Sequence, residues 1–408
     1  MLCRALPGTA RDAPPERVKG NGMARRTTTV AAGLLAVALT AGACGGGTSS
    51  GRGTEYVIGF QGPLSGDGQQ LGVNAVNGAR TAVDRANRSG RLPFTLRLVE
   101  ADDQGSAEQG PTAAQKLIDD PDIIGVVGPV FSGATKASEP LYSQASLLSV
   151  SPSATNPQLT ELGFVSFYRV IAPDTVQGTA AADYVAKALK SRKVFSLDDK
   201  SEYGTGLSGV LEKELRTQGV NVTHDAVNPT KDYTSEATKI ISEKPDTVFY
   251  SGYYQEFALL AKALRAKGFT GTLMSGDGSN DDQFIAQAGA ANAEGAYLTC
   301  PCGDPNSDPR AAGFVADYKQ VNNGAQPGTY SGEAYDATNA VIEVLRTLGP
   351  GASREAVAQA FASVDFEGVT KRIVFSPTGD VTGSTVYVYQ VRGGRRNVLG
   401  TTAGLIKP

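Results

Sequence analysis

The chain has 408 residues, of which 40% are hydrophobic and 19% are charged, so its apolar content suffices for the cores of two domains rather than one. With 38 basic and 41 acidic residues, its formal net charge is −3, and it lacks the basic excess typical of nucleic-acid binding. One histidine and four cysteines disfavour a metal cluster, and a serine hydrolase would have to use His224 as its only imidazole. We therefore expect no enzyme, no metal site, no cofactor and no nucleic-acid partner.

The amino terminus has the pattern of a secretory signal. Two arginines follow Met23, and a short apolar run at 30–39 comes next. This run is too short to span a bilayer as a helix, which needs about 20 residues. Residues 1–22 carry scattered charges and prolines and are interpreted as a misassigned upstream start, and the choice between Met1 and Met23 stays open.

The small residues Thr-Ala-Gly-Ala come directly before Cys44. They resemble the lipobox of bacterial lipoproteins, in which a peptidase cuts before the cysteine and its thiol carries diacylglycerol. The resemblance implies lipidation of Cys44, with 23–43 as the signal peptide and 44–53, rich in glycine and serine, as a tether. Ordinary signal cleavage nearby with a free thiol is the alternative. The sequence thus predicts an extracytoplasmic protein anchored to the cell membrane.

From Tyr56 onward, short β-rich runs alternate with alanine-rich segments of helical period, which is typical of parallel α/β units. The predicted strands are 56–60, 95–101, 123–127, 147–151 and 167–171, then 193–197, 220–226, 247–251, 272–275 and 295–299. The predicted helices include 73–88, 175–190, 206–218, 256–267 and 333–348. Two consecutive series of similar length predict an α/β fold with two doubly wound, Rossmann-like lobes.

Polar, glycine-rich segments follow most of these strands, where open α/β sheets bind their ligands. These segments are 62–66, 102–104, 128–133, 151–155, 198–204, 251–254 and 276–278. They bring hydroxyls, backbone amides, tyrosines and one lone carboxylate to one edge, without a nucleophile paired to a base, a phosphate loop or a metal set. The pattern predicts a small-molecule binding site without catalytic machinery.

Six motifs carry a resemblance to a known family. They are Gly-Pro-Leu-Ser-Gly at 62–66, Val-Gly-Pro at 127–129, Ser-Pro-Ser-Ala-Thr-Asn-Pro at 151–157, Tyr-Gly-Thr-Gly at 203–206, Tyr-Ser-Gly-Tyr-Tyr at 250–254 and Gly-Asp-Gly at 276–278. In this order and spacing, the chain resembles the branched-chain amino acid binding proteins of ABC transporters, the type I periplasmic binding proteins. The resemblance implies a three-strand hinge between a first lobe of 54–173 with 301–383 and a second lobe of 174–300 with 384–408.

The resemblance also implies how a ligand is held. The first lobe would bind the α-carboxylate of an amino acid through hydroxyls and backbone amides, at Ser132, Ser153, Ala154 and Thr155. The second lobe would bind the ammonium through Asp277, with Tyr203 and Tyr253 closing over the ligand, and Asp174 matches a further cleft carboxylate. A zwitterion is net neutral, so neutral donors at one end and one negative charge at the other suit it.

The chain departs from the family's pattern at several of these positions. Leu71 stands where leucine-binding members have a cleft tyrosine, and Asp277 stands where the family has a glutamate. Gly105 and Phe131 stand where some members have a disulfide. These departures leave the identity of the ligand open.

Each predicted contact has a structural alternative. The serine and threonine hydroxyls could cap helices, the two tyrosines could be packing residues, and Asp277 could be a turn residue. The convergence of several loops on one edge favours ligand contact. His224 lies in a polar stretch and is predicted to be an exposed strand residue.

Cys300 and Cys302 flank Pro301 just after the last strand of the second series. Residues two apart on an extended chain point the same way, so a disulfide or two free thiols stay open, with the disulfide favoured in an exported protein. Zinc would need four ligands, and the sequence offers no second pair. We interpret the pair as a ring that stiffens one hinge strand.

The predicted protein is a monomeric solute-binding lipoprotein of an ABC importer. It would capture a small amino acid, branched-chain or related, by closure of the two lobes and deliver it to the permease subunits. The alternative is a sensory receptor of the same fold for an amino acid, an amide or another small polar ligand.

Overall fold

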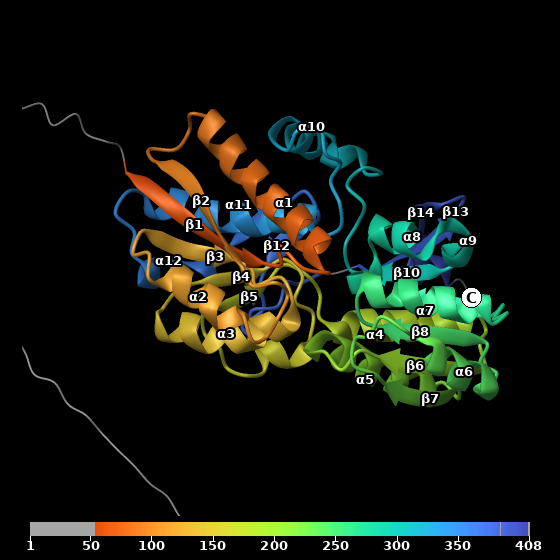
Figure 1. Ribbon diagram of the computed structural model, residues 1–408. Helices are drawn as coiled ribbons and strands as arrows, with labels where there is room; N and C mark the ends of the chain where they lie inside the picture. The colour runs from red at the N-terminus through yellow and green to blue at the C-terminus, as the bar shows by residue number, and fades with distance from the viewer. Residues whose placement is uncertain (1–53, 384, 407–408) are drawn as a thin grey trace, which may run out of the picture. The chain divides into compact units, whose positions relative to one another are not determined.

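The computed structural model describes residues 54–383 and 385–406. The predicted signal peptide, Cys44 and the tether lie outside these residues. Five parallel strands form the first sheet, in the order β2–β1–β3–β4–β5 (Figure 1). The strands are β1 (Glu55–Gly62), β2 (Thr95–Asp102), β3 (Ile123–Val127), β4 (Ser149–Ser151) and β5 (Phe167–Arg169). All five lie where the sequence predicted strands.

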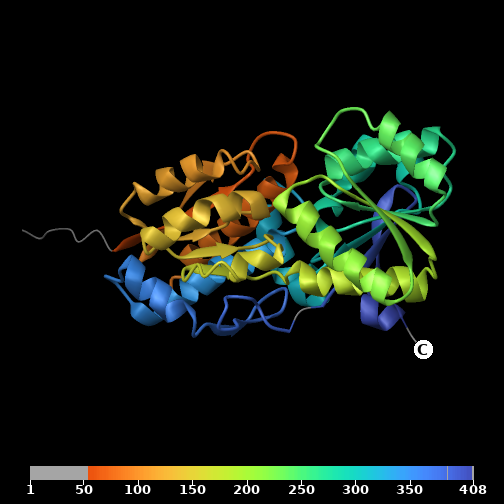
Figure 2. The same ribbon diagram turned by 90° about the horizontal axis from the view of Figure 1, so that it is seen from below.

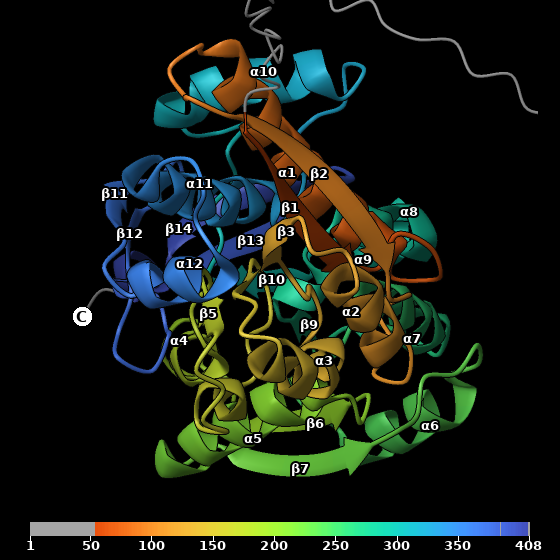
Figure 3. The ribbon, with the colours of Figure 1, turned by 90° about the vertical axis from the view of Figure 1, so that its left-hand side faces the viewer.

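Helices cover both faces of this sheet, and together they form what we call the first lobe. On one face, α1 (Gln69–Arg88) packs along α11 (Ser331–Leu348), although 262 positions separate their first residues (Figures 1 and 3). The other face carries α2 (Gly110–Ile118) and α3 (Ser132–Gln144). The smaller elements are η1 (Pro157–Thr160), α12 (Arg354–Phe361), β11 (Asp365–Glu367) and β12 (Arg372–Val374).

Seven strands form the second sheet, in the order β14–β13–β10–β9–β8–β6–β7. Five predicted strands are parallel, namely β6 (Lys193–Asp198), β7 (Asn221–Ala226), β8 (Thr247–Ser251), β9 (Thr272–Ser275) and β10 (Tyr297–Cys300). The last two strands, β13 (Tyr387–Arg392) and β14 (Arg395–Thr401), were not predicted from the sequence. They form an antiparallel hairpin beside β10 (Figure 2).

Helices also cover both faces of this second sheet, and we call the assembly the second lobe. One face carries α4 (Asp174–Asp183), its continuation η2 (Tyr184–Ala188) and α5 (Glu202–Thr217). The remaining helices of this lobe are α6 (Thr234–Glu243), α7 (Tyr254–Ala266), η3 (Asp277–Ser279), α8 (Asp282–Ala288), α9 (Ala290–Ala293) and α13 (Thr402–Leu405). In the sequence, η4 (Pro309–Ala311) and α10 (Ala312–Val321) follow β10 of the second lobe and precede α11 of the first lobe. No helix of the described residues is long and apolar enough to cross a membrane.

The order of strands in both sheets explains where a site can form. β1 lies between β2 and β3, and β6 lies between β7 and β8, so in each sheet the connections diverge to opposite faces from the first strand. Open α/β sheets bind ligands in the crevice at such switch points. The predicted fold, two doubly wound α/β lobes, is confirmed, whereas the residue boundaries of the lobes stay a prediction.

Close packing of α1 on α11 depends on a glycine. A Cβ atom built on Gly78 would lie 2.1 Å from the backbone oxygen of Ser331, so no other residue fits without separating the helices. Gly209, in the middle of α5, is a matched contrast because a Cβ atom there would meet nothing within 4 Å.

We predict that Gly78→Ala lowers the free energy of unfolding by about 1–3 kcal/mol, since overpacking outweighs the better helix propensity of alanine. Gly209→Ala should instead raise it by about 0.5–1 kcal/mol. Urea unfolding of both variants checks this. Equal effects at the two positions would show that helix propensity, not the α1–α11 contact, decides the outcome.

Candidate functional site

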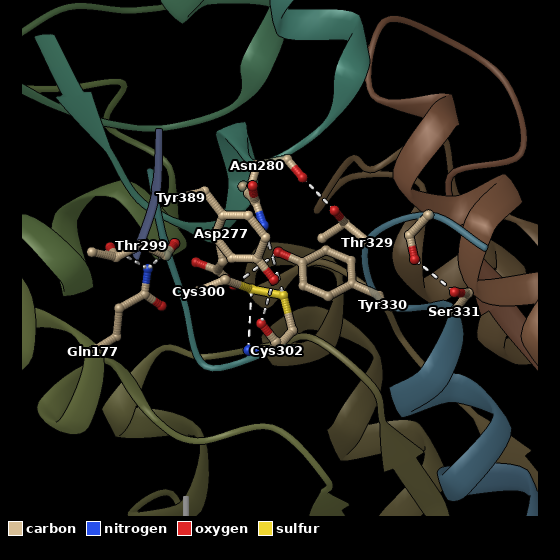
Figure 4. Close-up of a disulfide and its surroundings, with 12 residues drawn as sticks. Gln177, Asp277, Asn280, Thr299, Cys300, Cys302, Thr329, Tyr330, Ser331 and Tyr389 are labelled. Carbon is tan, nitrogen blue, oxygen red and sulfur yellow. Dashed lines mark hydrogen bonds between the residues drawn. A yellow bond between two sulfur atoms is a disulfide. The ribbon is translucent and has the colours of Figure 1, made fainter. Parts of the chain in front are cut away.

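A buried carboxylate between the two lobes is the centre of the candidate site. Asp277 begins η3 directly after β9 and is 1% exposed. Its Oδ1 accepts a hydrogen bond from the Tyr203 hydroxyl at 2.7 Å, and its Oδ2 accepts one from the Tyr330 hydroxyl at 2.8 Å. Tyr203 lies in the first turn of α5. Tyr330, drawn near Asp277 in Figure 4, precedes α11 of the first lobe. Asp277 is therefore held from both lobes.

A second buried carboxylate accompanies Asp277. Asp174 is the first residue of α4 and is fully buried, and neither of its carboxylate oxygens has a hydrogen-bond partner among the described residues. Burial raises the pKa of Asp174 well above its usual value, and the charge of Asp277 raises it further. Burial also raises the pKa of Asp277, against the hydrogen bonds from the two tyrosines. This pairing favours a cationic group between the lobes.

The hydroxyls predicted to bind a carboxylate belong to the first lobe, where Ser132 is the first residue of α3 and Ser153 and Thr155 follow β4. The alternative that they cap helices is wrong, because Asn156 caps η1 with its own side chain and Phe131 occupies the N-cap position of α3. Ser132 Oγ accepts a hydrogen bond from the backbone N–H of Asn156 at 3.3 Å. Thr155 Oγ1 is buried and has no partner among the described residues. A ligand contact from the Thr155 hydroxyl stays a prediction.

Ser153 and Ala154 are engaged within the first lobe. The Ser153 hydroxyl donates to the Val130 carbonyl oxygen at 2.6 Å, and the Ala154 N–H donates to Ser151 Oγ at 3.0 Å. These bonds fix the loop after β4 against the loop after β3. A direct ligand contact from either residue stays a prediction.

Arg169 holds the same loop from behind. Its guanidinium is fully buried and donates to the carbonyl oxygens of Ala154 at 3.1 Å and Asn156 at 2.7 Å. Its Nε pairs with Asp380 at 2.6 Å. Burial lowers the pKa of Arg169, whereas the charge of Asp380 opposes this shift. A buried guanidinium that donates several hydrogen bonds to one loop restricts the conformation of that loop.

Four of the eight predicted residues line one small cavity of about 10 Å³, whereas Ala154, Thr155, Asp174 and Asp277 are not part of its lining. Its lining is Val130, Phe131, Ser132, Ser153, Tyr203, Tyr253, Gly278 and Tyr330. The rings of Phe131 and Tyr253 stack with centroids 4.3 Å apart, and Tyr253 lies 5.3 Å from the ring of Tyr203. The structure therefore brings Ser132, Ser153, Tyr203 and Tyr253 together at one place, with Asp277 bound to two of the lining tyrosines.

Polar contacts join the lobes on either side of this cavity. Lys136 of α3 pairs with Glu202 of α5 at 2.8 Å, and Lys231 pairs with Asp67 at 2.5 Å. The Tyr254 hydroxyl also donates to the Asp67 carbonyl oxygen at 2.7 Å. The two lobes are thus in contact around the site.

A larger cavity, of about 930 Å³, lies elsewhere and is not the candidate site. Asn74 and Asp281 in its lining hydrogen-bond each other at 3.0 Å. Arg396 there donates to the carbonyl oxygen of Asn280 at 2.6 Å and pairs with Asp282 at 2.7 Å. These charged groups are already satisfied by the protein, unlike Asp174 in the smaller site.

Cys300 and Cys302 form a disulfide in the structure (Figure 4). Cys300 ends β10, and both residues are buried. The Tyr389 hydroxyl donates to the Cys302 carbonyl oxygen at 2.9 Å, and Asn280, whose N–H donates to the Asp277 carbonyl oxygen, lies beside the Cys302 sulfur. The ring therefore sits where the chain leaves the second sheet, close to Asp277. Its stiffening of the hinge stays a prediction.

Two residues of the site were missed from the sequence. Tyr330 follows no strand, so a search of strand ends does not find it, and its φ of +70° in Gly-Thr-Tyr-Ser-Gly shows only in the structure. Phe131 lies in the predicted segment 128–133 and at a family cysteine position, but the sequence predicts no role for it in the site. Its position between Val130 and Ser132, directly after β3, was the available signal.

The comparisons with known proteins agree with this fold. The model of the family described as periplasmic binding protein matches residues 55–396. The chain belongs to this family. Among curated relatives, the Leu/Ile/Val-binding protein BraC3 of Rhizobium johnstonii is 32% identical, over 84% of this chain and 93% of its own length. The leucine-specific-binding protein of Salmonella typhimurium is 28% identical, over 90% and 97%.

Solved structures of periplasmic binding proteins resemble this one closely. The leucine-binding protein LivK of Thermotoga maritima has a TM-score of 0.78 and 26% identity, over 85% of this chain and 98% of its own. LivJ of Streptococcus pneumoniae, solved in complex with isoleucine, has a TM-score of 0.78 and 25% identity, over 85% and 100%. The predicted family, its fold and its solute-binding role are confirmed.

A third buried carboxylate lies behind the first-lobe loops. Glu139 of α3 is fully buried; its Oε1 accepts a hydrogen bond from the Ser149 hydroxyl at 2.5 Å, and its Oε2 has no partner among the described residues. Burial raises the pKa of Glu139 from 4.5 to about 8. The folded protein therefore favours the protonated form of this side chain.

We predict that Glu139→Gln changes how stability depends on pH. Because its pKa is raised in the folded state, Glu139 contributes to the free energy of unfolding of the wild type. This contribution is complete below about pH 4.5 and is lost as the pH rises to about 8. The glutamine of the variant is neutral at every pH. Between about pH 4.5 and 8, the free energy of unfolding of the variant should therefore rise relative to that of the wild type, by up to about 4 kcal/mol. Urea unfolding at several pH values measures the difference. Glu108→Gln, at an exposed position, is the control, and a constant difference for Glu139→Gln would contradict the burial argument.

Proposed function

We propose that this protein is the extracytoplasmic receptor of an ABC importer, and that it captures a small amino acid, branched-chain or related, between its two lobes. One observation carries the proposal. The buried carboxylate of Asp277 is held by one tyrosine from each lobe, beside a second carboxylate, Asp174, that has no hydrogen-bond partner among the described residues. A ligand with an ammonium group supplies the positive charge that this pair lacks.

The other end of the cavity suits a carboxylate. Ser132 and Ser153 line it, and the free hydroxyl of Thr155 is on the same loop. Ser132 Oγ accepts from the Asn156 N–H and keeps its own proton for a ligand carboxylate, whereas the Ser153 proton is already donated to the Val130 carbonyl oxygen. A zwitterion would therefore meet neutral groups at its negative end and carboxylates at its positive end. The names of the relatives, which include Leu/Ile/Val-binding and leucine-specific-binding proteins, support the same class of ligand.

Closure of the lobes would couple binding to delivery. A ligand held by first-lobe hydroxyls gains its contact with Asp277 only when the second lobe approaches, so it favours the closed form by that difference in affinity. The closed monomer would then dock on the permease subunits. Binding and release in this cycle need no chemical step, and we therefore propose that the protein is no enzyme.

We predict that Asp277→Asn weakens amino acid binding by about 2 kcal/mol or more, which is at least about 30-fold in Kd, because the ammonium loses its charged partner. Calorimetric titration with leucine, isoleucine, valine, amides and short peptides measures this. Asp225→Asn, on the surface of β7, is the control. Unchanged affinity in a folded Asp277→Asn variant would place the ammonium elsewhere, and a wild type that binds none of these solutes would overturn the proposed function.

We also propose that Cys44 carries the lipid that anchors the protein to the cell membrane. Cys44→Ala should move the protein from the membrane fraction to the soluble fraction, since each buried methylene of an acyl chain contributes about 0.8 kcal/mol. Immunoblots of fractionated cells measure the distribution. Cys3→Ala is the matched control and should change nothing. A Cys44→Ala variant that stays in the membrane fraction would contradict lipidation at this residue.

A further inference from the structure

Phe131 forms an aromatic wall of the cavity that neither the predicted carboxylate contacts nor the predicted ammonium contact explains. It follows β3 at the switch point of the first sheet, and it is 7% exposed. Its ring stacks on Tyr253, which follows β8 at the switch point of the second sheet, with 26° between the ring planes. The stack therefore crosses from one lobe to the other.

Two glycines support the ring from the side of the first lobe. A Cβ atom at Gly68 would lie 2.9 Å from Phe131 Cε2, and one at Gly105 would lie 2.7 Å from the same atom. Both positions must therefore be glycine for the ring to lie where it does, since a side chain at either one would push the ring aside. Tyr253 belongs to the other lobe and moves away whenever the lobes separate.

The cavity beside the stack has distinct polar and apolar parts. Ser132, Ser153 and the tyrosines bound to Asp277 form the polar part, whereas Val130 and the two stacked rings form the apolar part. Its volume of about 10 Å³ is that of about one water molecule. An amino acid therefore enters only if the stacked rings separate, and its side chain then lies against them.

We propose that Phe131 determines the size of the ligand side chain that the cleft accepts. This proposal rests on the proposed function. The ring is the fixed wall and Tyr253 is the movable wall, so a small aliphatic side chain fits against Phe131 with little separation. A phenyl side chain requires a wider separation, which weakens the contacts between the lobes. Removing the ring leaves a space of phenyl shape next to the polar part of the cavity.

The test is calorimetric titration of the intact protein and of Phe131→Ala with valine, leucine and phenylalanine. The wild type should prefer the aliphatic amino acids. In Phe131→Ala, the affinity for leucine should fall about tenfold and that for phenylalanine should rise about tenfold, in the range that one buried apolar group provides. Phe131→Leu, which keeps an apolar side chain of smaller width, should shift the ratio of affinities in the same direction by less. Phe366→Ala, in β11, is the control and should leave the ratio unchanged.

Gly68→Ala tests the same wall from behind. Gly68 has φ of −87°, which alanine adopts freely, and the added methyl group would press the ring toward the cavity. This variant should bind leucine more weakly than the wild type and should exclude phenylalanine further. In the Phe131→Ala background, Gly68→Ala should have no effect, because the methyl group then meets no ring.

Each outcome decides between distinct conclusions. If Phe131→Ala and Phe131→Leu bind amino acids with the wild-type ratio of affinities, the assignment of Phe131 is wrong and the proposed function stands. If Gly68→Ala weakens leucine binding equally with and without Phe131, it acts on the loop and not through the ring, which also overturns the assignment. If the wild type binds no amino acid, the proposed function is wrong, and the inference about Phe131 is wrong as well.

Discussion

A negative charge buried between two lobes is the constraint on which the rest of the structure depends. The carboxylate of Asp277 cannot stay ionised in that position without donors, and it receives one from Tyr203 and one from Tyr330. Because these tyrosines belong to different lobes, Asp277 has both hydrogen-bond donors only when the lobes are close together. A cationic ligand group favours the ionised carboxylate and, through it, the closed arrangement.

The two lobes contribute differently to the site. The first lobe supplies a prepared surface, since Arg169 holds the carbonyl oxygens of the loop at 154–156 and glycines hold the ring of Phe131 in place. The second lobe supplies the charge of Asp277 and the ring of Tyr253. The first lobe thus offers a rigid surface and the second lobe a charged surface that moves. With this arrangement, the same binding energy selects the ligand and favours closure of the lobes.

The buried carboxylates of this protein have different environments, and their proposed roles differ accordingly. Glu139 lies behind the loops with one hydroxyl donor, so burial leaves it favouring the protonated form. Asp277 has two tyrosine donors that oppose the effect of burial on its pKa. Asp174 has no partner among the described residues and faces the charge of Asp277. Of these three, Asp277 is bonded to two tyrosines that line the cavity and its charge acts on Asp174, so we propose this pair as the partner of a cationic ligand group.

The sequence by itself determined the ten parallel strands, the two doubly wound lobes, and the segments after the strands in which Ser132, Ser153, Tyr203 and Asp277 are found. Short β-branched runs and the residues that follow them are local features, so a local pattern is enough to identify them. The tertiary structure alone decided that Tyr330 reaches Asp277, that Phe131 stacks on Tyr253, and that the hairpin β13–β14 completes the second sheet. Each of these is a contact between distant segments, and such contacts depend on how the lobes and the returning chain pack, which no local pattern encodes.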